Sequence, residues 1–431
     1  MERVLAVIKF YLTMFLLIVG FSSQAAEPVI HKQLNFSGKN FALYQTLNPA
    51  ALLIADESGQ LLYSDNIEQA MVPASTTKLI TALLALQHWG AEHRFYTDFT
   101  FYPCQTSAKD CARLEIKAYG DPFLVSEELA QIAATLAEKL QVHGISHIEQ
   151  MALVNHWYQQ PLVMPGAGKS LNPYDAINGA LVANFNSLNA RKNQLGWQSA
   201  EEQTPWVSVA DDIVQHSGLT LKQGKSERIN TGANTQLNQQ YAVELLQAFL
   251  KKHAITTANS TLQIAQASQE APRFTYRHQN SRTLAEVVQP MMKYSTNFIA
   301  NQIALNLAAE VYGTPASGEK VQRLFHDKLS QQFGWSQDDV HFLDGAGLSR
   351  ENRINAYQLY QVLEAFKPWK GLLPEIEQGV FAKSGSLIGV STLAGYFHHR
   401  QQWMPFVFLS NQRVPYRFRN RLAKSLSEQL P

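Results

Sequence analysis

Hydrophobic and polar positions in the first part of the chain predict a β-hairpin followed by a buried helix. An apolar run, a polar turn and a second apolar run predict a hairpin over 50–65. Residues 79–86 are apolar nearly all round, a pattern typical of a helix buried in a large core, and Pro73 marks its entry.

Later segments add elements of both types. Leucine and isoleucine positions at helical spacing predict an amphipathic helix over 126–142. Residues 174–189 follow neither the helical nor the strand period, so no element is assigned to them. Four more segments show clear patterns: helices over 239–252 and 283–309, and strands over 381–397 and 403–409.

Length, charge and composition exclude several classes of protein. The 431 residues suffice for two or three domains, and 36 basic against 35 acidic residues leave a formal charge of +1. This balance argues against a nucleic-acid-binding protein held by a broad basic surface. Hydrophobic residues make up 45%, enough for a substantial core, and only 16% are charged, which argues against a coiled coil. No apolar run after residue 30 approaches the roughly 20 residues of a membrane helix.

The N-terminus and the cysteines predict export. Residues 1–26 resemble a secretory signal: Arg3 and Lys9 are positive, an apolar stretch follows, and small residues precede the expected cleavage point. The alternative is an uncleaved membrane anchor. Cys104 and Cys111 would close a short disulfide loop in an oxidising compartment, the alternative being two buried thiols. A metal site at this pair is disfavoured, because no histidine or further cysteine lies beside it.

Three short motifs carry the candidate chemistry, and the first is Ser75-Thr76-Thr77-Lys78. Positions i and i+3 of a helix share a face, so the amine of Lys78 can reach the hydroxyl of Ser75. A serine hydroxyl needs a base to become a nucleophile, and a neutral lysine can serve if its pKa falls from about 10.4. Burial and a second cation nearby would lower the pKa of Lys78.

The other two motifs follow later in the chain. Ser295-Thr296-Asn297 offers a second hydroxyl that can relay a proton to a leaving group, and an amide that can hold a substrate carbonyl and Lys78. Lys383-Ser384-Gly385 lies on a predicted strand and offers a cation for a substrate carboxylate. Because Gly385 has no side chain, a substrate backbone is expected to lie along the strand edge there.

Each motif alone also has a purely structural interpretation. Ser75 could cap a helix, the motif at 295–297 could be a cap or turn, and Lys383 could be a solvated strand charge. The only Lys-Ser/Thr-Gly string in the chain is the one at 383–385. The three motifs in this order, each in a fitting local context, favour the chemical interpretation. Strings similar to the first two occur elsewhere, at 64–66, 170–172, 187–189 and 317–320.

The ordered set resembles the serine acyl-enzyme motifs of penicillin-binding proteins and class A β-lactamases. Longer strings at 73–83, 344–350 and 383–390 resemble the D-alanyl-D-alanine carboxypeptidase/endopeptidase group, the class C low-molecular-mass penicillin-binding proteins. The segment between Lys78 and Ser295 is far longer than in a simple β-lactamase, and this group is similar in carrying an insertion at that point.

The resemblance implies a fold and a division of the chain. The expected fold is α/β of the α+β type: a DD-peptidase/β-lactamase-like antiparallel sheet with helices on both faces, plus a large inserted region. Residues 27–95 and 282–431 would form the catalytic domain, residues 96–281 the insertion, and residues 1–26 the signal peptide.

The resemblance also implies residue roles. Ser75 would be acylated with Lys78 as its base, and Ser295 and Asn297 would assist proton transfer and substrate placement. Lys383 would face the terminal carboxylate of the substrate. Substrate would also contact Ser384, Gly385 and Ser386, with the backbone N–H groups of Ser75 and Ser386 as the oxyanion hole. The chemistry needs no metal or organic cofactor.

The implied function is a periplasmic serine DD-peptidase that hydrolyses D-Ala-D-Ala termini or D-Ala cross-links of peptidoglycan, or both. Its partners would be peptidoglycan stem peptides, with β-lactams as covalent inhibitors, no nucleic acid, and a membrane only through an uncleaved signal. Two alternatives are a β-lactamase with the same nucleophile and a catalytically silent peptidoglycan-binding or sensor protein.

Several residues depart from the group. Ser384 stands where Thr is common, and Thr296 stands where Asp is frequent. Asn155 follows an apolar run at a place where relatives often carry Asp, so recognition of a diaminopimelate amino end is left open. The Trp-rich stretch of the group is replaced by residues 165–170.

Two further patterns are not assigned a function. Residues 165–170 resemble the end of a phosphate-binding loop, but Val163 stands where that loop needs Gly. His143 and His147 have the spacing of two metal ligands on a helix, but Gly144 between them weakens a helix and no third ligand is evident. A loop at a helix end is expected there.

Overall fold

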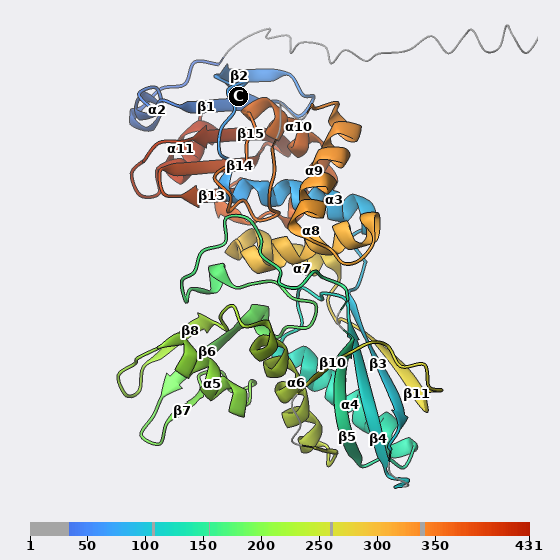
Figure 1. Cartoon of the computed structure of the whole chain (residues 1–431). Coiled ribbons are helices and arrows are strands. Elements are labelled where there is room, and N and C mark those ends of the chain that lie inside the picture. Colours follow the sequence, from blue (N-terminus) through green and yellow to red (C-terminus); the bar gives the residue numbers. More distant parts are fainter. Residues whose placement is uncertain (1–33, 106–107, 155, 259–261, 337–340) are drawn as a thin grey trace, which may run out of the picture.

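The computed structural model describes residues 34–431 apart from 106–107, 155, 259–261 and 337–340. The chain forms an upper part, coloured blue and orange to red in Figure 1, and a lower part coloured cyan to yellow. The ends of the described chain therefore meet in the upper part, while the middle of the chain forms the lower part. The expected signal at 1–26 and Asn155 lie outside the described residues.

The upper part is built on a six-stranded antiparallel sheet. Strand β1 lies beside β15, so an N-terminal strand pairs with a C-terminal one, and Leu52 stands opposite Phe408. The predicted hairpin over 50–65 is confirmed as β1 and β2. In spatial order the strands are β12 (Glu375–Glu377), β13 (Val380–Leu387), β14 (Val390–His399), β15 (Gln402–Ser410), β1 (Ala50–Ala55) and β2 (Leu61–Asp65).

Helices cover both faces of this sheet, as expected. Every residue of β1 is buried, because its alternate side chains enter two different cores. Leu53 packs in the core that includes α3 and α10, whereas Leu52 packs in the core that includes α2 and α11. The expected fold class is thereby confirmed. The helices on the two faces are α3 (Thr77–Trp89), α8 (Asn297–Tyr312) and α10 (Ala356–Phe366) on one, and α2 (Lys39–Tyr44) and α11 (Phe418–Ser427) on the other.

The helical segment predicted over 283–309 is two helices, not one. Helix α7 (Leu284–Tyr294) ends at Ser295, whose φ of 57° is left-handed, and α8 begins at Asn297. A left-handed residue ends the helical hydrogen-bond ladder, although the apolar pattern continues across it. The break turns the second motif into a corner between two helices. Helix α9 (Gly318–Phe333) then packs beside α8.

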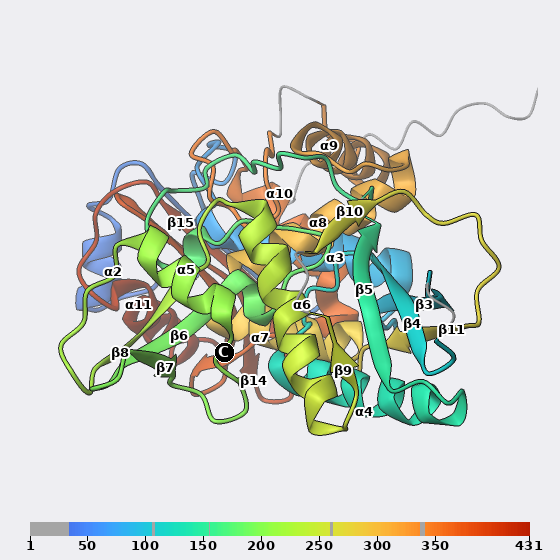
Figure 2. The same cartoon turned by 60° about the horizontal axis from the view of Figure 1, so that its bottom comes forward.

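The lower part contains two smaller sheets, which Figure 2 brings forward. Helix α4 (Ser126–Val142) confirms the helix predicted over 126–142, and α6 (Thr235–Lys252) contains the one predicted over 239–252. The unassigned residues 174–189 contain only short 3-10 turns and the start of β6. The first sheet consists of β10 (Gln263–Ala265), β5 (His147–Val154), β4 (Cys111–Ala118), β3 (Tyr96–Pro103) and β11 (Phe274–Gln279), with β9 (Thr256–Thr257) beside β5; the second consists of β7 (Trp197–Ser199), β6 (Ser187–Lys192) and β8 (Ser226–Asn230), near α5 (Ser208–Ser217).

Two smaller expectations concern covalent and membrane features. The predicted disulfide between Cys104 and Cys111 is present and joins the residue after β3 to the first residue of β4. Among the helices of the described residues, none combines the length and the hydrophobicity needed to cross a bilayer.

Candidate functional site

The three motifs meet in one site between the sheet and the helices of the upper part. The Nζ atom of Lys78 lies 3.1 Å from Oγ of Ser75 and 2.8 Å from Oδ1 of Asn297. The Nζ atom of Lys383 donates to Oγ of Ser295 at 3.0 Å. Residues from the start of α3, the corner between α7 and α8, and strand β13 are thus brought together by the fold.

Ser75 lies in a tight 3-10 turn, Ala74–Thr76, directly before α3. The hydroxyls of Thr76 and Thr77 donate back to the carbonyls of Pro73 and Ala74, and Ala74 itself has a left-handed φ of 49°. The residue at the N-cap of α3 is Thr76, so the alternative in which Ser75 caps this helix is wrong. The turn instead directs the Ser75 hydroxyl toward Lys78.

The amine of Lys78 is completely buried and surrounded by oxygen atoms. Besides Ser75 and Asn297, it donates to the carbonyl of Ala346 at 2.7 Å. Burial lowers the pKa of Lys78 to about 7, and the nearby carboxylate of Asp344 opposes that shift. A neutral amine has two N–H groups and one lone pair, so it can donate to Asn297 and Ala346 while accepting the proton of Ser75.

A loop that the motifs do not include places the Ala346 carbonyl. The buried carboxylate of Asp344 accepts backbone N–H groups from Ala346, Leu348 and Ser349 and so fixes the loop's path. Gly347 has a left-handed φ of 80°, and a Cβ there would overlap the Ala74 carbonyl. The sequence shows the string 344–350 only as a family marker; its signal is an Asp directly before a Gly-Ala-Gly run.

Lys383 is 1% exposed, so the alternative of a solvated strand charge is wrong. Its Nζ donates to Ser295 and to the carbonyl of Ser384 at 2.6 Å. Burial lowers the pKa of Lys383 well below its usual range, and the cations Lys78 and Arg419 lower it further. Ser295 occupies a helix end, as its structural alternative expected, and it also faces this lysine.

The strand that carries Lys383 has a free edge beside the site. Strand β12 pairs only with the first residues of β13, so the backbone after Lys383 has no strand on that side among the described residues. The expectation for Gly385 needs correction, because a Cβ there would overlap Thr392 Oγ1 and approach Pro73 O and Ser75 N. The absence of a side chain at Gly385 therefore makes room for the turn that carries Ser75, and not for a substrate.

A further residue of the site, Arg419, lies behind the same strand and was not among the predicted site residues. From α11, its Nη1 donates to the carbonyl of Gly385 and, at 2.7 Å, to Oγ of Ser386. These bonds hold the part of β13 next to Ser75. The sequence carries no signal for this contact, since Arg419 resembles any basic residue of an amphipathic helix.

The remaining sequence patterns have structural uses. Ser317 caps α9 by accepting the N–H of Lys320. The carboxylate of Asp175 accepts the N–H groups of Gly168 and Ser170, so an anion already fills the loop that resembles a phosphate site. His143 and His147 belong to different elements. His143 caps the C-terminus of α4 and stacks on Phe274, while His147 begins β5 and forms a hydrogen bond with Thr256.

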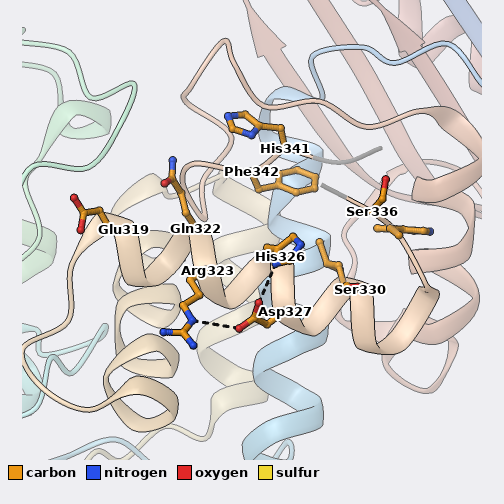
Figure 3. A pocket seen from close by; sticks show the side chains of 11 residues that line it. Glu319, Gln322, Arg323, His326, Asp327, Ser330, Ser336, His341 and Phe342 are labelled. Atoms are coloured by element: carbon orange, nitrogen blue, oxygen red, sulfur yellow. Dashed lines mark hydrogen bonds and ion pairs between the residues drawn. The ribbon is translucent and has the colours of Figure 1, made fainter. Parts of the chain in front are cut away.

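A cavity of about 670 Å³ opens along α9, away from the three motifs (Figure 3). Asp327 accepts from Arg323 and pairs with His326 there, and the hydroxyl of Tyr312 also donates to it. None of the lining residues belongs to the three motifs. The candidate chemistry is therefore located at Ser75 and not in this cavity.

Comparison with known proteins identifies the family of the chain. The model of the D-Ala-D-Ala carboxypeptidase 3 (S13) family matches residues 47–217 and 185–376. A D-alanyl-D-alanine carboxypeptidase DacB from Haemophilus influenzae is 24% identical over 78% of this chain and 79% of the relative. A D-alanyl-D-alanine carboxypeptidase from Actinomadura sp. is 21% identical over 84% of this chain and 77% of the relative.

Solved structures show the same fold. Penicillin-binding protein 4 of Haemophilus influenzae has a TM-score of 0.70 at 21% identity, covering 91% of this chain and 100% of that one. A predatory peptidoglycan endopeptidase of Bdellovibrio bacteriovorus has a TM-score of 0.51 at 14% identity, covering 89% and 92%. With the family match extending over more than half of its length, the chain belongs to the D-Ala-D-Ala carboxypeptidase 3 (S13) family and is a DD-peptidase of the low-molecular-mass penicillin-binding type.

Proposed function

We propose that this DD-peptidase works through an acyl-enzyme on Ser75, with peptidoglycan stem peptides as substrates and β-lactams as covalent inhibitors. The observation that carries the proposal is the contact of 3.1 Å between Ser75 and Lys78, whose buried amine has a pKa of about 7. A base with a pKa near the working pH is both free to accept a proton and able to return it.

Acylation follows from this pair. Neutral Lys78 takes the proton of Ser75, whose Oγ attacks the carbonyl carbon of the penultimate D-Ala. The peptide bond then breaks, an ester to Ser75 remains, and the leaving D-Ala amine takes up a proton. That proton is the one Lys78 took from Ser75: the hydroxyl of Ser295, which is bonded to the buried Lys383, gives its own proton to the amine and takes the proton of the Lys78 ammonium in return, so Lys78 becomes neutral again. Water then cleaves the ester with Lys78 again as the base, which restores Ser75.

Substrate binding uses the edge of β13. Lys383 and Ser384 take the terminal carboxylate, and the backbone N–H groups of Ser75 and Ser386 receive the oxyanion. Support comes from the surroundings of Lys383: burial and the cations Lys78 and Arg419 lower its pKa, and a bound carboxylate would favour its charged form again. Asn297 holds the substrate carbonyl while its Oδ1 contacts Lys78. The peptide lies along the free strand edge beside Ser384 and Ser386.

The proposal includes the division of the chain and its place in the cell. The catalytic domain consists of residues 27–95 and 282–431, supported by the shared sheet of β1, β2 and β12–β15. Residues 96–281 form the insertion, supported by the separate sheets of the lower part. The signal at 1–26 directs the chain to the periplasm, where the disulfide between Cys104 and Cys111 is stable.

The test is the intact mass of the purified protein after mixing with benzylpenicillin, beside the variant Ser75→Ala. We expect an adduct of one penicillin on the unchanged protein and none on the variant, together with release of D-Ala from a peptide ending in D-Ala-D-Ala. Consumption of penicillin without an adduct would indicate a β-lactamase. Intact penicillin with no adduct and no D-Ala release would indicate a silent binding protein, and either result would overturn the proposal.

A further inference from the structure

Helix α8 carries more buried amide side chains than a catalytic motif needs. Beyond Asn297, the side chains of Asn301, Gln302 and Asn306 are at most 3% exposed. The large majority of buried amide groups in folded proteins are hydrogen-bonded. The partners of these side chains therefore show what α8 holds in place.

The partners of the Gln302 side chain belong to one segment of the insertion. Residues 174–180, which we call the strap, run along α8 in the green trace between the upper and lower parts of Figure 1. Gln302 Nε2 donates to the carbonyl of Gly179 at 2.6 Å, and Asn178 Nδ2 donates to Gln302 Oε1 at 2.8 Å. Asn178 also donates to the backbone carbonyl of Phe298 at 3.0 Å. The strap is thus bonded to α8 in both directions.

The chain just before the strap is held by the small sheet. Asn230, at the end of β8, donates its side-chain amide to the carbonyls of Ser170 at 2.7 Å and Asn172 at 2.8 Å. The carboxylate of Asp175 holds the preceding turn through the N–H of Ser170. With bonds on both sides of it, the backbone at Tyr174 has little freedom to shift along α8.

The strap reaches the candidate catalytic residues at one atom. Asn297 Nδ2 donates to the carbonyl of Tyr174 at 3.1 Å, while Oδ1 of the same amide accepts from Lys78. A carbonyl cannot donate, so the Tyr174 oxygen determines which end of the amide faces it. The amide oxygen is then the end that faces Lys78.

We propose that the strap is a positioning element of the active site: it orients the amide of Asn297, and Asn178 and Gln302 are positioning residues because they hold the strap on α8. This inference rests on the proposed acyl-enzyme function. Without the strap, the amide can rotate and present its NH₂ group to Lys78, which repels the ammonium and offers no acceptor to it.

The test compares acylation by benzylpenicillin, followed by intact mass over time and pH, in the unchanged protein and in Gln302→Met. Methionine keeps the side-chain length but removes both amide bonds. We expect acylation to slow roughly 5- to 10-fold, the effect of one misdirected hydrogen bond. We also expect the acid limb of the pH profile to move to lower pH, because an ammonium that loses an acceptor gives up its proton more readily. The charged groups around Lys78 that stay unchanged are Asp344 and Lys383.

Matched variants separate positioning from stability. Thr204→Val removes a buried hydrogen bond inside the insertion, between Thr204 and Ser126, without touching the strap, and should leave the rate and the pH limb unchanged. Asn178→Ala should reproduce the effect of Gln302→Met from the strap side, which provides a test if the methionine variant does not fold.

The outcomes distinguish this inference from the proposed function. No adduct on the unchanged protein would overturn the acyl-enzyme and the inference with it. An adduct that forms on Gln302→Met and Asn178→Ala at the unchanged rate and pH limb would overturn the inference alone. An equal loss of rate in Thr204→Val would also overturn it, since any destabilisation of the insertion would then have the same effect.

Discussion

The two buried lysines of the site resemble each other in geometry and differ in their surroundings. Each amine contacts a serine hydroxyl at nearly the same distance, 3.1 Å for Lys78 and 3.0 Å for Lys383. Lys78 has three oxygen acceptors and the carboxylate of Asp344 nearby, whereas the charged neighbours that act on Lys383 are Lys78 and Arg419. The amine of Lys78 therefore has its hydrogen-bond acceptors within the chain, whereas the surroundings of Lys383 favour the binding of an anion. This difference supports the proposal that Lys78 transfers the proton and Lys383 binds a carboxylate.

The largest expected effect comes from replacing the proton acceptor. Lys78→Arg keeps a cation but cannot become neutral, and its larger head does not fit the buried position. We expect the rate of acylation by benzylpenicillin to fall about 1,000-fold. Intact mass over time measures the rate, and a melting curve checks the fold. A folded variant with at least a tenth of the normal rate would show that Lys78 is not the base.

A smaller effect is expected on the other half of the site. Lys383→Met removes the charge but keeps an apolar chain of similar length in the buried position. We expect kcat/KM for a peptide ending in D-Ala-D-Ala to fall about 10- to 100-fold, the range for a hydrogen bond to a charged group. The same peptide with an amidated C-terminus is the control, because it carries no carboxylate. If the variant still prefers the free acid, another group binds the carboxylate.

The pH dependence of acylation tests how the surroundings of Lys78 differ from those of Lys383. Acylation should rise as the pH passes about 7, where Lys78 loses its proton, and stay level above that. Asp344 raises the pKa of Lys78, so Asp344→Asn should move the limb to lower pH. Asp98→Asn, on β3 and paired with Arg277, is the control and should leave the limb in place. If the acid limb does not move in Asp344→Asn, a group other than Lys78 produces it.

The smallest expected effect concerns the loop after Asp344, whose Ala346 carbonyl accepts from Lys78. Gly347→Ala forces a Cβ against the Ala74 carbonyl at a left-handed φ, so it should destabilise the fold by about 1–3 kcal/mol and slow acylation. Gly371→Ala is the matched control, because a Cβ there meets open space. Thermal melts of both variants provide the comparison. Equal melting temperatures would mean that the Ala74 turn tolerates the methyl group.

Much of the fold follows from short-range patterns in the chain. The hairpin at 50–65, the helix at 126–142 and the disulfide at Cys104 were predictable, because each depends on residues close in sequence. The break between α7 and α8 was not, since the apolar period runs on through Ser295. Its left-handed backbone becomes evident only in the folded chain.

The site divides in the same way. The contact of Ser75 with Lys78 was predictable from their spacing on one helical turn. The reason for Gly385 was misjudged, because the atoms that exclude a side chain there belong to Pro73, Ser75 and Thr392. Three contacts were missed for the same reason, because their partners lie far away in sequence. They are the contact of the Asp344 loop with Lys78, the bond from Arg419 to β13 and the bonds between the strap and α8.

By itself, the sequence determined which residues are chemically able to act and in which order they occur. It also determined the elements that carry them, since hydrophobic period and helical spacing are properties of neighbouring residues. Only the tertiary structure decided that both lysines are buried, that β1 pairs with β15, and that a segment of the insertion contacts Asn297. The physical reason is that a lysine loses its proton near neutral pH through desolvation, and desolvation depends on what the rest of the chain packs around it.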